Sequence, residues 1–448
     1  MSGTGTEETS TSTTSQATTG TVTGGALVGP PAAEIRSASA PRVRVERAVV
    51  RRLAARVEGL TVVEHRGGAV PRPVAQAPSN PSGPHEMTVM DHRAYAAAAR
   101  SGSAGLGEGY FRGWWHADDL VGLLRMLIGV MRPIDRRRDR LHALTRPLLD
   151  PVRQLRRPNP DRDRRNVRAH YDLGNEFFAA FLDETMTYSS AVFEHPTMSL
   201  AEASTAKLDR ICRKIGLTDA HHLVEIGTGW GSLALHAAGR YGAHVTTTTV
   251  SAAQAALARE RFAAAGLADR IDLREVDYRH LTGTYDRLVS IEMIEAVDWR
   301  EVPGYLQTCA RLLRPDGVMG LQAIVMADQR WARARLTEDF IKRWVFPGGS
   351  LPSLTSIADA VTRRTDLRII DIEDLGLHYA ETLHRWRDQL LERWDDLASL
   401  GVTEELGRLW DFYLAYCEAA FLERHVSVAQ IVLAKPRWRP DGVAVRSR

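Results

Sequence analysis

The sequence predicts an α/β fold in which a parallel-type sheet is covered by helices on both faces. From about residue 220 onward, short apolar or β-branched segments alternate with segments of helical character. That order of elements is typical of parallel strands joined by crossover helices. A glycine-rich loop directly follows the first of these strands, and ligands bind at this end of the strands in such folds.

Seven segments have the length and composition of strands. Helical segments lie between the first and second, the second and third, and the fourth and fifth of them. The helices are expected at 232–241, at 252–265, which is rich in alanine, and at 302–313. A longer segment, 383–424, is also predicted to be helical and carries many aromatic residues. The predicted strands, in chain order, are 223–227, 244–250, 271–277, 287–293, 317–325, 367–375 and 428–434.

The chain before the sheet divides by composition into a tail and a small domain. Residues 1–33 are mostly Thr, Ser, Gly and Ala, so they offer too little apolar surface to offset the entropy of ordering, and we expect a disordered tail. Residues 34–131 are expected to form a small N-terminal domain, with a glycine-rich turn at 105–110 and an apolar helix at 120–131. A stretch rich in Pro, Gly and Ser, 76–84, is predicted to be a surface loop.

A basic linker, 132–165, is predicted between this domain and the sheet-containing domain, 166–440. From Met131 to Arg168 there are 13 Arg against 5 Asp. Such a run is either a solvated linker or a contact with anionic lipid headgroups, where each cation contributes on the order of 1 kcal/mol. Nucleic acid is the less favoured partner, because no aromatic residues are interleaved for base stacking.

Composition excludes several classes of protein. The 448 residues carry 58 Lys and Arg against 55 Asp and Glu, a net charge of +3, which is unlike a histone-like or polyacidic protein. Cys212, Cys309 and Cys417 are far apart, so we expect neither a disulfide scaffold nor a metal site built on thiolates. No apolar run approaches the roughly 18–20 residues of a membrane-spanning helix. The N-terminus lacks the pattern of a secretory signal, and the chain is consistent with the cytosol.

The glycine-rich loop at 225–231 reads EIGTGWG and is the most informative short motif. Gly227, Gly229 and Gly231 permit a sharp turn and a close approach of a ligand to the backbone. A dinucleotide loop would read GxGxxG, whereas here Glu225 precedes the glycines, which suits a cationic amino-acid ligand better than a pyrophosphate. The loop therefore favours S-adenosylmethionine, with a nicotinamide dinucleotide or a purely structural turn as alternatives.

Residues after the next two strands fit the same ligand. Asp277 ends the third strand, where its carboxylate is expected to accept a hydrogen bond from an adenine amino group, and Tyr278 is expected to lie against the ring. The alternative for Asp277 is a helix cap or turn. Thr249 lies at the end of the second strand and Gln254 follows that strand, and the two residues complete the predicted cofactor site.

Several motifs, taken in order, resemble those of cyclopropane-fatty-acyl-phospholipid synthases and mycolic-acid methyltransferases, including the methylene-branching fatty-acid methyltransferases. The resemblance is strong over roughly 165–436. It extends to the N-terminal domain through GLGEGY at 105–110 and GWW at 113–115. The motifs are HYDLGNEFF at 170–178, TYSSA at 187–191, the glycine-rich loop, EMIE at 292–295, FPGGSLPS at 346–353 and HY at 378–379.

The resemblance implies a class I S-adenosylmethionine-dependent methyltransferase fold. This is a Rossmann-like, seven-stranded sheet with helical acyl-side insertions, plus a small N-terminal α+β lipid-side domain. The implied reaction moves a methyl group to the cis double bond of an acyl chain carried on a phospholipid. By the same resemblance, Tyr188 and Ser189 lie near the cofactor. The three glycines then cradle its amino-acid end, while Gln254 and Asp277 hold the ribose and adenine.

The proton acceptor is where the sequence departs from its relatives. In cyclopropane-forming members, a bicarbonate bound around a Cys, a Glu, a His and a Tyr is taken as the base. The matching positions here are Ser190, Glu295, Gln322 and Tyr379, and the His that usually follows the Glu is Ala296. An anion site that loses an imidazolium binds bicarbonate less well, so its role is doubtful here. We therefore expect Glu295 to act as the base.

Other side chains complete the catalytic candidates. Glu292 or Glu176 is expected near Glu295, and His170 is included from the first motif. Methyl transfer to an alkene creates a carbocation, which aromatic faces stabilise when water is excluded. The aromatic residues of the acyl-side segments either do this or simply form core; they are Trp344, Phe346, Tyr379, Trp386, Tyr413 and Tyr416.

These changes favour a methylene-branching methyltransferase acting on an oleoyl-type chain, with cyclopropane synthesis as the alternative. The expected partners are a membrane phospholipid, a reductase for the methylene product and a second copy of the chain, and no nucleic acid. The expected location is the inner face of the membrane, with the protein peripherally attached. Competing hypotheses are a methyltransferase acting on O or N of a small molecule, a lipid-binding protein without chemistry, and a nicotinamide oxidoreductase.

Overall fold

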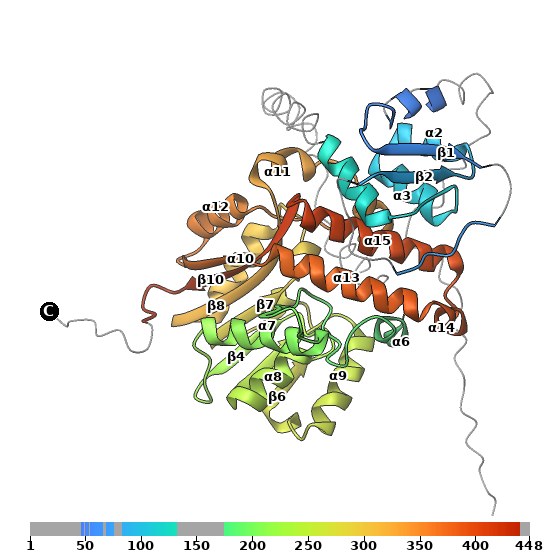
Figure 1. Ribbon diagram of the computed structural model, residues 1–448. Coiled ribbons are helices and arrows are strands. Elements are labelled where there is room, and N and C mark those ends of the chain that lie inside the picture. The colour runs from blue at the N-terminus through green and yellow to red at the C-terminus, as the bar shows by residue number, and fades with distance from the viewer. Residues whose placement is uncertain are drawn as a thin grey trace, which may run out of the picture.

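The computed structural model describes residues 46–48, 50–52, 54–65, 69–75, 83–131 and 174–439 (Figure 1). The predicted tail 1–33 and the predicted basic linker 132–165 lie outside the described residues, as does most of the predicted loop 76–84. Within the described ranges, no helix has both the length and the apolar character needed to cross a membrane.

The large sheet has seven strands, in the order β6-β5-β4-β7-β8-β10-β9. All seven predicted strand segments are present. Neighbours from β6 to β8 are parallel, whereas β10 runs antiparallel to both β8 and β9. The predicted α/β class is confirmed, and the antiparallel strand is an addition to it. The strands are β4 (His222–Ile226), β5 (His244–Thr248), β6 (Ile271–Arg274), β7 (Tyr285–Ile291), β8 (Leu313–Met326), β9 (Arg368–Asp374) and β10 (Val426–Ala434).

Helices cover both faces of this sheet, as the sequence predicts. One apolar cluster joins the sheet to α7 (Leu200–Lys214), α8 (Ser232–Tyr241) and α9 (Ala252–Ala264). A second cluster joins it to α10 (Val302–Leu312) and α12 (Leu354–Arg364). Helix α7 begins with a capping box in which the Ser199 and Glu202 side chains satisfy each other's backbone amides.

The predicted long helical segment is broken into three helices. These are α13 (Gly376–Glu392), α14 (Trp394–Ser399) and α15 (Glu404–Leu422). Gly401 has a positive φ of 78°, which ends α14 and turns the chain into α15. Helices α13 and α15 lie side by side between the two sheets of the protein (Figure 1). Their aromatic residues are the centre of the largest apolar cluster.

A small three-stranded sheet and two short helices precede the large sheet. Strands β1 (Leu60–Glu64) and β2 (His85–Val89) are parallel, and β3 (Trp115–Ala117) is antiparallel to β2. Helix α2 (Arg93–Ser101) leads into α3 (Ser103–Phe111). Residues 120–131 are helical, as predicted.

The predicted glycine-rich turn at 105–110 is wrong, because these residues form most of α3. A Cβ added at Gly105 would lie 1.9 Å from the carbonyl oxygen of Ala97 on α2. One added at Gly107 would lie 2.2 Å from the ring of Phe340. The glycines therefore allow backbones and rings to approach closely, and tertiary packing overrides their poor helix propensity.

A buried polar network joins α3 to the α13–α15 pair. The Tyr110 hydroxyl donates to one carboxylate oxygen of Asp411 at 2.5 Å, and the Arg387 guanidinium donates to the other at 2.7 Å. All three side chains are buried. The Arg408 guanidinium lies over the Tyr110 ring and donates to the carbonyl of Pro71. The small sheet and the large domain therefore share one continuous core.

Candidate active site

The glycine-rich loop connects β4 to α8 in a strained conformation that only glycine adopts easily. Gly227, Gly229 and Gly231 have φ values of 100°, 52° and 89°. A Cβ at Gly231 would lie 2.5 Å from the ring of Phe262, whereas one at Gly229 would meet nothing within 4 Å. The loop is therefore packed against α9 at one end and faces open space at Gly229.

Buried polar side chains surround this loop at the carboxyl ends of β4 and β5. Glu225 accepts a hydrogen bond of 2.6 Å from the Thr247 hydroxyl, and burial raises the pKa of its carboxyl to about 8. The Thr249 hydroxyl donates to the side-chain oxygen of Gln254 at 3.1 Å. The predicted pair Thr249 and Gln254 is thus brought together.

Asp277 and Tyr278 follow β6, and their contacts with adenine stay a prediction. Asp277 accepts a hydrogen bond of 2.9 Å from the Arg279 amide and caps the short 3₁₀ helix Tyr278–His280, which is the alternative role considered for it. The Tyr278 ring is 8% exposed and packs edge-on against Tyr305 at 5.2 Å. Tyr278 therefore packs into the core of the protein beside Tyr305.

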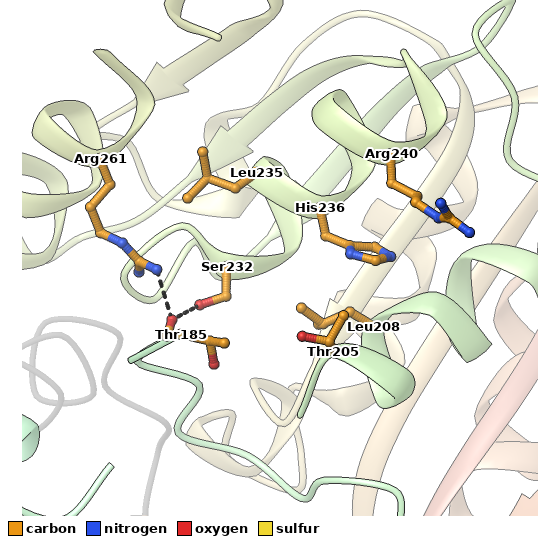
Figure 2. Close-up of a pocket in the computed structure, with 8 residues that line it drawn as sticks. All are labelled: Thr185, Thr205, Leu208, Ser232, Leu235, His236, Arg240 and Arg261. Carbon is orange, nitrogen blue, oxygen red and sulfur yellow. Dashed lines mark hydrogen bonds between the residues drawn. The ribbon is translucent and has the colours of Figure 1, made fainter. Parts of the chain in front are cut away.

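The segment that carries Tyr188 and Ser189 is fixed to the start of α8. The carbonyl of Thr185 accepts hydrogen bonds from the Ser232 hydroxyl and the Arg261 guanidinium (Figure 2). A pocket of about 330 Å³ opens beside this contact. None of the predicted site residues lines it. Its lining residues are Thr185, Thr205, Leu208, Ser232, Leu235, His236, Arg240 and Arg261.

Lys207, which sequence reasoning missed, lies beneath this segment. Its ammonium group donates a hydrogen bond of 2.6 Å to the Ser189 hydroxyl, and both side chains are buried. Burial lowers the pKa of Lys207 to about 8, and the charges of Glu292, Asp183 and Glu225 act against this shift. A signal was present in the sequence, because Lys207 falls on the apolar stripe of α7 with Ala203 and Ile211.

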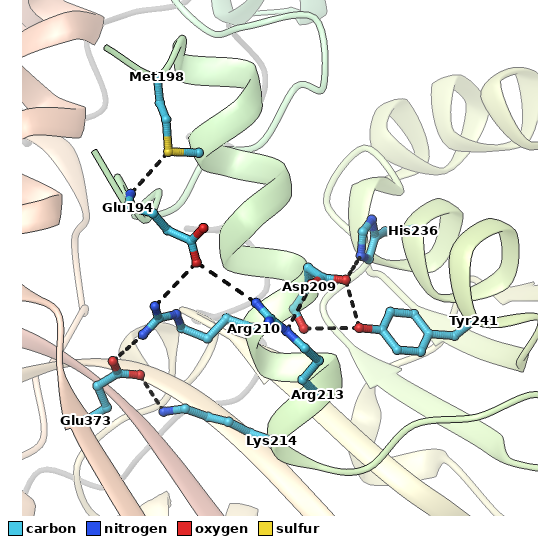
Figure 3. A network of polar contacts seen from close by, with 9 residues as sticks. All are labelled: Glu194, Met198, Asp209, Arg210, Arg213, Lys214, His236, Tyr241 and Glu373. Carbon is cyan, nitrogen blue, oxygen red and sulfur yellow. Dashed lines mark hydrogen bonds and ion pairs between the residues drawn. The ribbon is translucent and has the colours of Figure 1, made fainter. Parts of the chain in front are cut away.

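The outer face of α7 carries partly exposed ion pairs and no buried cation. Arg210 and Lys214 pair with Glu373 on β9, and Asp209 accepts a hydrogen bond of 2.8 Å from Tyr241 (Figure 3). Arg213 pairs with Asp209 within the helix. These ion pairs are partly exposed, so Lys207 is the cation of this helix that points inward.

Glu292 lies at the centre of the carboxylate cluster. It follows β7 with a φ of 49°, a left-handed conformation that is rare for a residue with a Cβ. One of its carboxylate oxygens accepts hydrogen bonds from the Ser190 amide at 2.9 Å and the Gln322 side-chain amide at 2.8 Å. The other accepts a bond of 2.7 Å from the Tyr379 hydroxyl. Burial raises the pKa of Glu292, although Lys207 and these bonds act in the opposite direction.

Glu295 lies next to this group on the short helix Ile294–Ala296. One of its oxygens accepts from the Ile324 amide, and the other is buried without a hydrogen-bond partner among the described residues. Burial and the charge of Glu292 raise the pKa of Glu295 to about 8. The Ser350 amide donates to the Glu295 carbonyl at 2.9 Å, which ties the FPGGSLPS segment to the site.

The chain matches a family of known enzymes. Residues 159–431 match the family described as mycolic acid cyclopropane synthetase, which is more than half of the chain. The chain belongs to the mycolic acid cyclopropane synthetase family.

Relatives of this family cover most of the chain. The tuberculostearic acid methyltransferase UfaA1 of Mycobacterium tuberculosis is 43% identical over 79% of this chain and 84% of its own length. The cyclopropane-fatty-acyl-phospholipid synthase of Escherichia coli is 31% identical over 80% of this chain and 89% of its own. The solved structure of CmaA1, complexed with SAH and CTAB, has a TM-score of 0.57 and 31% identity, and covers 61% of this chain and 98% of its own.

As a member of the mycolic acid cyclopropane synthetase family, the protein is an enzyme that uses S-adenosylmethionine to methylate lipid acyl chains. The predicted family, fold class and methyl donor are confirmed. The residues present fit this donor. The open space at Gly229 leaves room for a ligand, and Glu225 supplies an acidic group next to the loop.

The predicted catalytic residues are only partly brought together. Ser190, Gln322 and Tyr379 surround Glu292, so the centre of the cluster is Glu292 and not Glu295, to which the sequence assigned the base. Glu176 has an exposed side chain at the start of α6 (Asn175–Ala179), so it does not join the buried cluster. His170 lies outside the described residues.

Aromatic rings surround the cluster on the side of α13 and α15. The Tyr188 ring packs on Trp386 at 5.2 Å, and its hydroxyl lies 3.1 Å from that of Tyr413. Tyr379 packs on Phe421 at 4.6 Å. Of the predicted aromatic set, Trp344, Tyr379, Trp386 and Tyr413 are buried in the largest apolar cluster, and Phe346 and Tyr416 pack against it partly buried.

Proposed function

We propose that this enzyme methylates the cis double bond of an oleoyl-type chain on a phospholipid and releases an exo-methylene branched product. The observation that supports this most is the pair Glu292 and Glu295, which are half-buried and lie beside aromatic rings. Met293, between them, lies 3.3 Å from the Cβ position of Gly227 in the cofactor loop. A proton acceptor in a dry, aromatic setting next to the methyl donor is what a carbocation reaction needs.

S-adenosylmethionine supplies an electrophilic methyl group on a sulfonium. The π electrons of the alkene form the new C–C bond while the S–CH₃ bond breaks and leaves its electron pair on sulfur, so S-adenosylhomocysteine is released. The neighbouring carbon of the alkene becomes cationic. A hydride shift from the methyl-bearing carbon moves the cation onto that carbon. A carboxylate then accepts a proton from the methyl group, and the electron pair of that C–H bond becomes the C=CH₂ double bond. The protein must hold the chain in line, because positioning carries much of the rate.

The choice of product rests on two further observations. Tuberculostearic acid, which is a methyl-branched fatty acid, gives the relative with 43% identity its name. Ser190, Ala296 and Gln322 replace the Cys and the two His residues at the matching positions of cyclopropane-forming members. A separate reductase, which adds a hydride and a proton, is needed to turn the methylene group into a saturated methyl branch. An enzyme with this substrate acts at a membrane surface, and we place it on the cytoplasmic face.

Expression in a host supplied with oleate tests the proposal. A cyclopropane and an exo-methylene group are isomers, so the purified fatty acid esters must be separated by chromatography and examined by proton NMR. We expect vinylidene protons and no cyclopropane protons. A product that contains only the ring would overturn the methylene assignment and support the second candidate, cyclopropane synthesis, which the 31% identity to the E. coli synthase favours.

A further inference from the structure

The carboxylate of Glu292 fills an anion site that three separate parts of the chain build. Its donors are the Ser190 amide, the Gln322 side chain on β8 and the Tyr379 hydroxyl on α13. These are three of the four positions at which the resemblance places the ligands of bicarbonate in cyclopropane-forming enzymes. In this chain a protein carboxylate therefore takes up the hydrogen bonds that would hold a free anion.

The surroundings hold the carboxylate in this place. The Gln430 side-chain amide donates to the Gln322 oxygen at 3.0 Å, so the Gln322 NH₂ group is directed toward Glu292. The left-handed backbone at Glu292 turns its side chain into the site, and strain of this kind at a half-buried, hydrogen-bonded residue indicates a functional constraint. Lys207 is the buried cation whose charge favours the ionised form of Glu292.

We propose that Glu292 is the built-in proton acceptor of the reaction and that the enzyme turns over without bicarbonate. The step is the one given above: the C–H electron pair of the methyl group forms the new bond, and the proton moves to a Glu292 oxygen. This deepens the proposed function and rests on it only for the cationic intermediate, which both candidate products share. Glu295 lies one turn away, and burial together with the charge of Glu292 raises the pKa of its carboxyl to about 8, so we assign it a positioning role.

The experiment compares wild type with Glu292→Gly and Glu292→Gln in buffer freed of bicarbonate, with and without added bicarbonate, formate or acetate. Transfer of labelled methyl groups to oleoyl-phospholipid vesicles is measured. The glycine variant removes the carboxylate, leaves its three donors in place and suits the positive φ. The glutamine variant removes the charge but keeps the site filled. Glu260→Gln, an exposed change on α9, is the matched control.

We expect the rate of methyl transfer by wild type and by Glu260→Gln to change less than about twofold when bicarbonate is removed. Both Glu292 variants should transfer methyl groups about 100-fold more slowly than wild type, or slower still, which is the usual scale of general base catalysis. Added small anions should raise the methyl-transfer rate of Glu292→Gly at least about tenfold and leave the rate of Glu292→Gln unchanged. SAH binding by calorimetry shows that each variant is folded. The proposal is overturned if wild type stops turning over without bicarbonate or if Glu292→Gly is fully active. It is also overturned if Glu292→Gly is folded and no added anion restores its activity. The product's structure, measured separately, decides the proposed function.

Discussion

The ammonium group of Lys207 and the hydroxyl of Ser189 lie 2.6 Å apart in the interior, where the charges of Glu225 and Glu292 also reach the lysine. Ser189 must accept this hydrogen bond, because an ammonium group only donates. The hydroxyl proton of Ser189 is therefore directed elsewhere, toward the cofactor side on the assignment implied by the resemblance.

Lys207→Met is expected to lower methyl transfer more than tenfold and also to lower the melting temperature. The variant removes the cation that favours ionised Glu292 and the hydrogen bond to Ser189, and removing one partner of a buried charge cluster is destabilising. Thermal unfolding and labelled methyl transfer measure the two effects. Lys214→Met, on the outer face of the same helix, should leave transfer unchanged. Full activity of Lys207→Met would show that the lysine has only a structural role.

Asp411→Asn is expected to destabilise the protein by about 3–5 kcal/mol, because it leaves the buried Arg387 guanidinium without its anion. Tyr110→Phe removes one hydrogen bond to the same carboxylate and should cost about 1.5–3 kcal/mol. Urea unfolding measures both. Asp395→Asn breaks the exposed pair with Arg72 and should cost less than about 1 kcal/mol. Equal losses in all three variants would contradict a special role for the buried network.

Stability is expected to fall as pH rises, in part because of Glu295. Its pKa is raised from about 4.5 to about 8, so the folded state keeps a proton that the unfolded state releases above pH 4.5. The stabilisation is complete below pH 4.5 and is lost as pH rises to about 8. The free energy of unfolding of Glu295→Gln, measured with urea, should therefore rise relative to that of wild type between about pH 5 and pH 8. That of Glu260→Gln should not rise relative to wild type. A difference that does not depend on pH would show that Glu295 is ionised throughout.

Alanine substitutions in the cofactor loop should separate binding from folding. Gly229→Ala places its Cβ in open space, so we expect a stability loss of about 1 kcal/mol for the positive φ, with a much larger loss of SAH affinity. Gly231→Ala forces a Cβ against Phe262 and should reduce both stability and SAH affinity. Calorimetric titration with SAH and thermal unfolding give the two readouts. Normal SAH binding by Gly229→Ala would place the ligand away from this loop.

Local patterns were sufficient to predict the strands of the large sheet but not their pairing. The segments around Leu223–Ile226 and His244–Thr248 are short, apolar or β-branched, and this information is local. The place of β10 between β8 and β9 depends on contacts between segments far apart in the chain, which no short window contains. Helix α3 was missed for the opposite reason, since its glycines are selected by contacts with Ala97 and Phe340.

The active site was likewise predicted in part from the sequence. The resemblance placed Ser190, Gln322 and Tyr379 in one group, and the structure brings them together. It put Glu295 in that group, whereas the three residues contact Glu292. That choice depends on the left-handed backbone at Glu292, and sequence composition does not reveal the sign of a φ angle at a glutamate.

The insertion of β10 affects the order in which the active site can assemble. Gln430 on β10 orients Gln322 on β8, and 108 residues separate them. Pairings between such distant residues form late, because closing a long loop costs entropy before any contact is gained. A folding intermediate in which β4 to β8 are already paired would contain the loop that binds the sulfonium donor. In this intermediate, Gln430 would not yet hold the Gln322 side-chain amide toward Glu292. We expect methyl-donor recognition to precede catalytic competence during refolding.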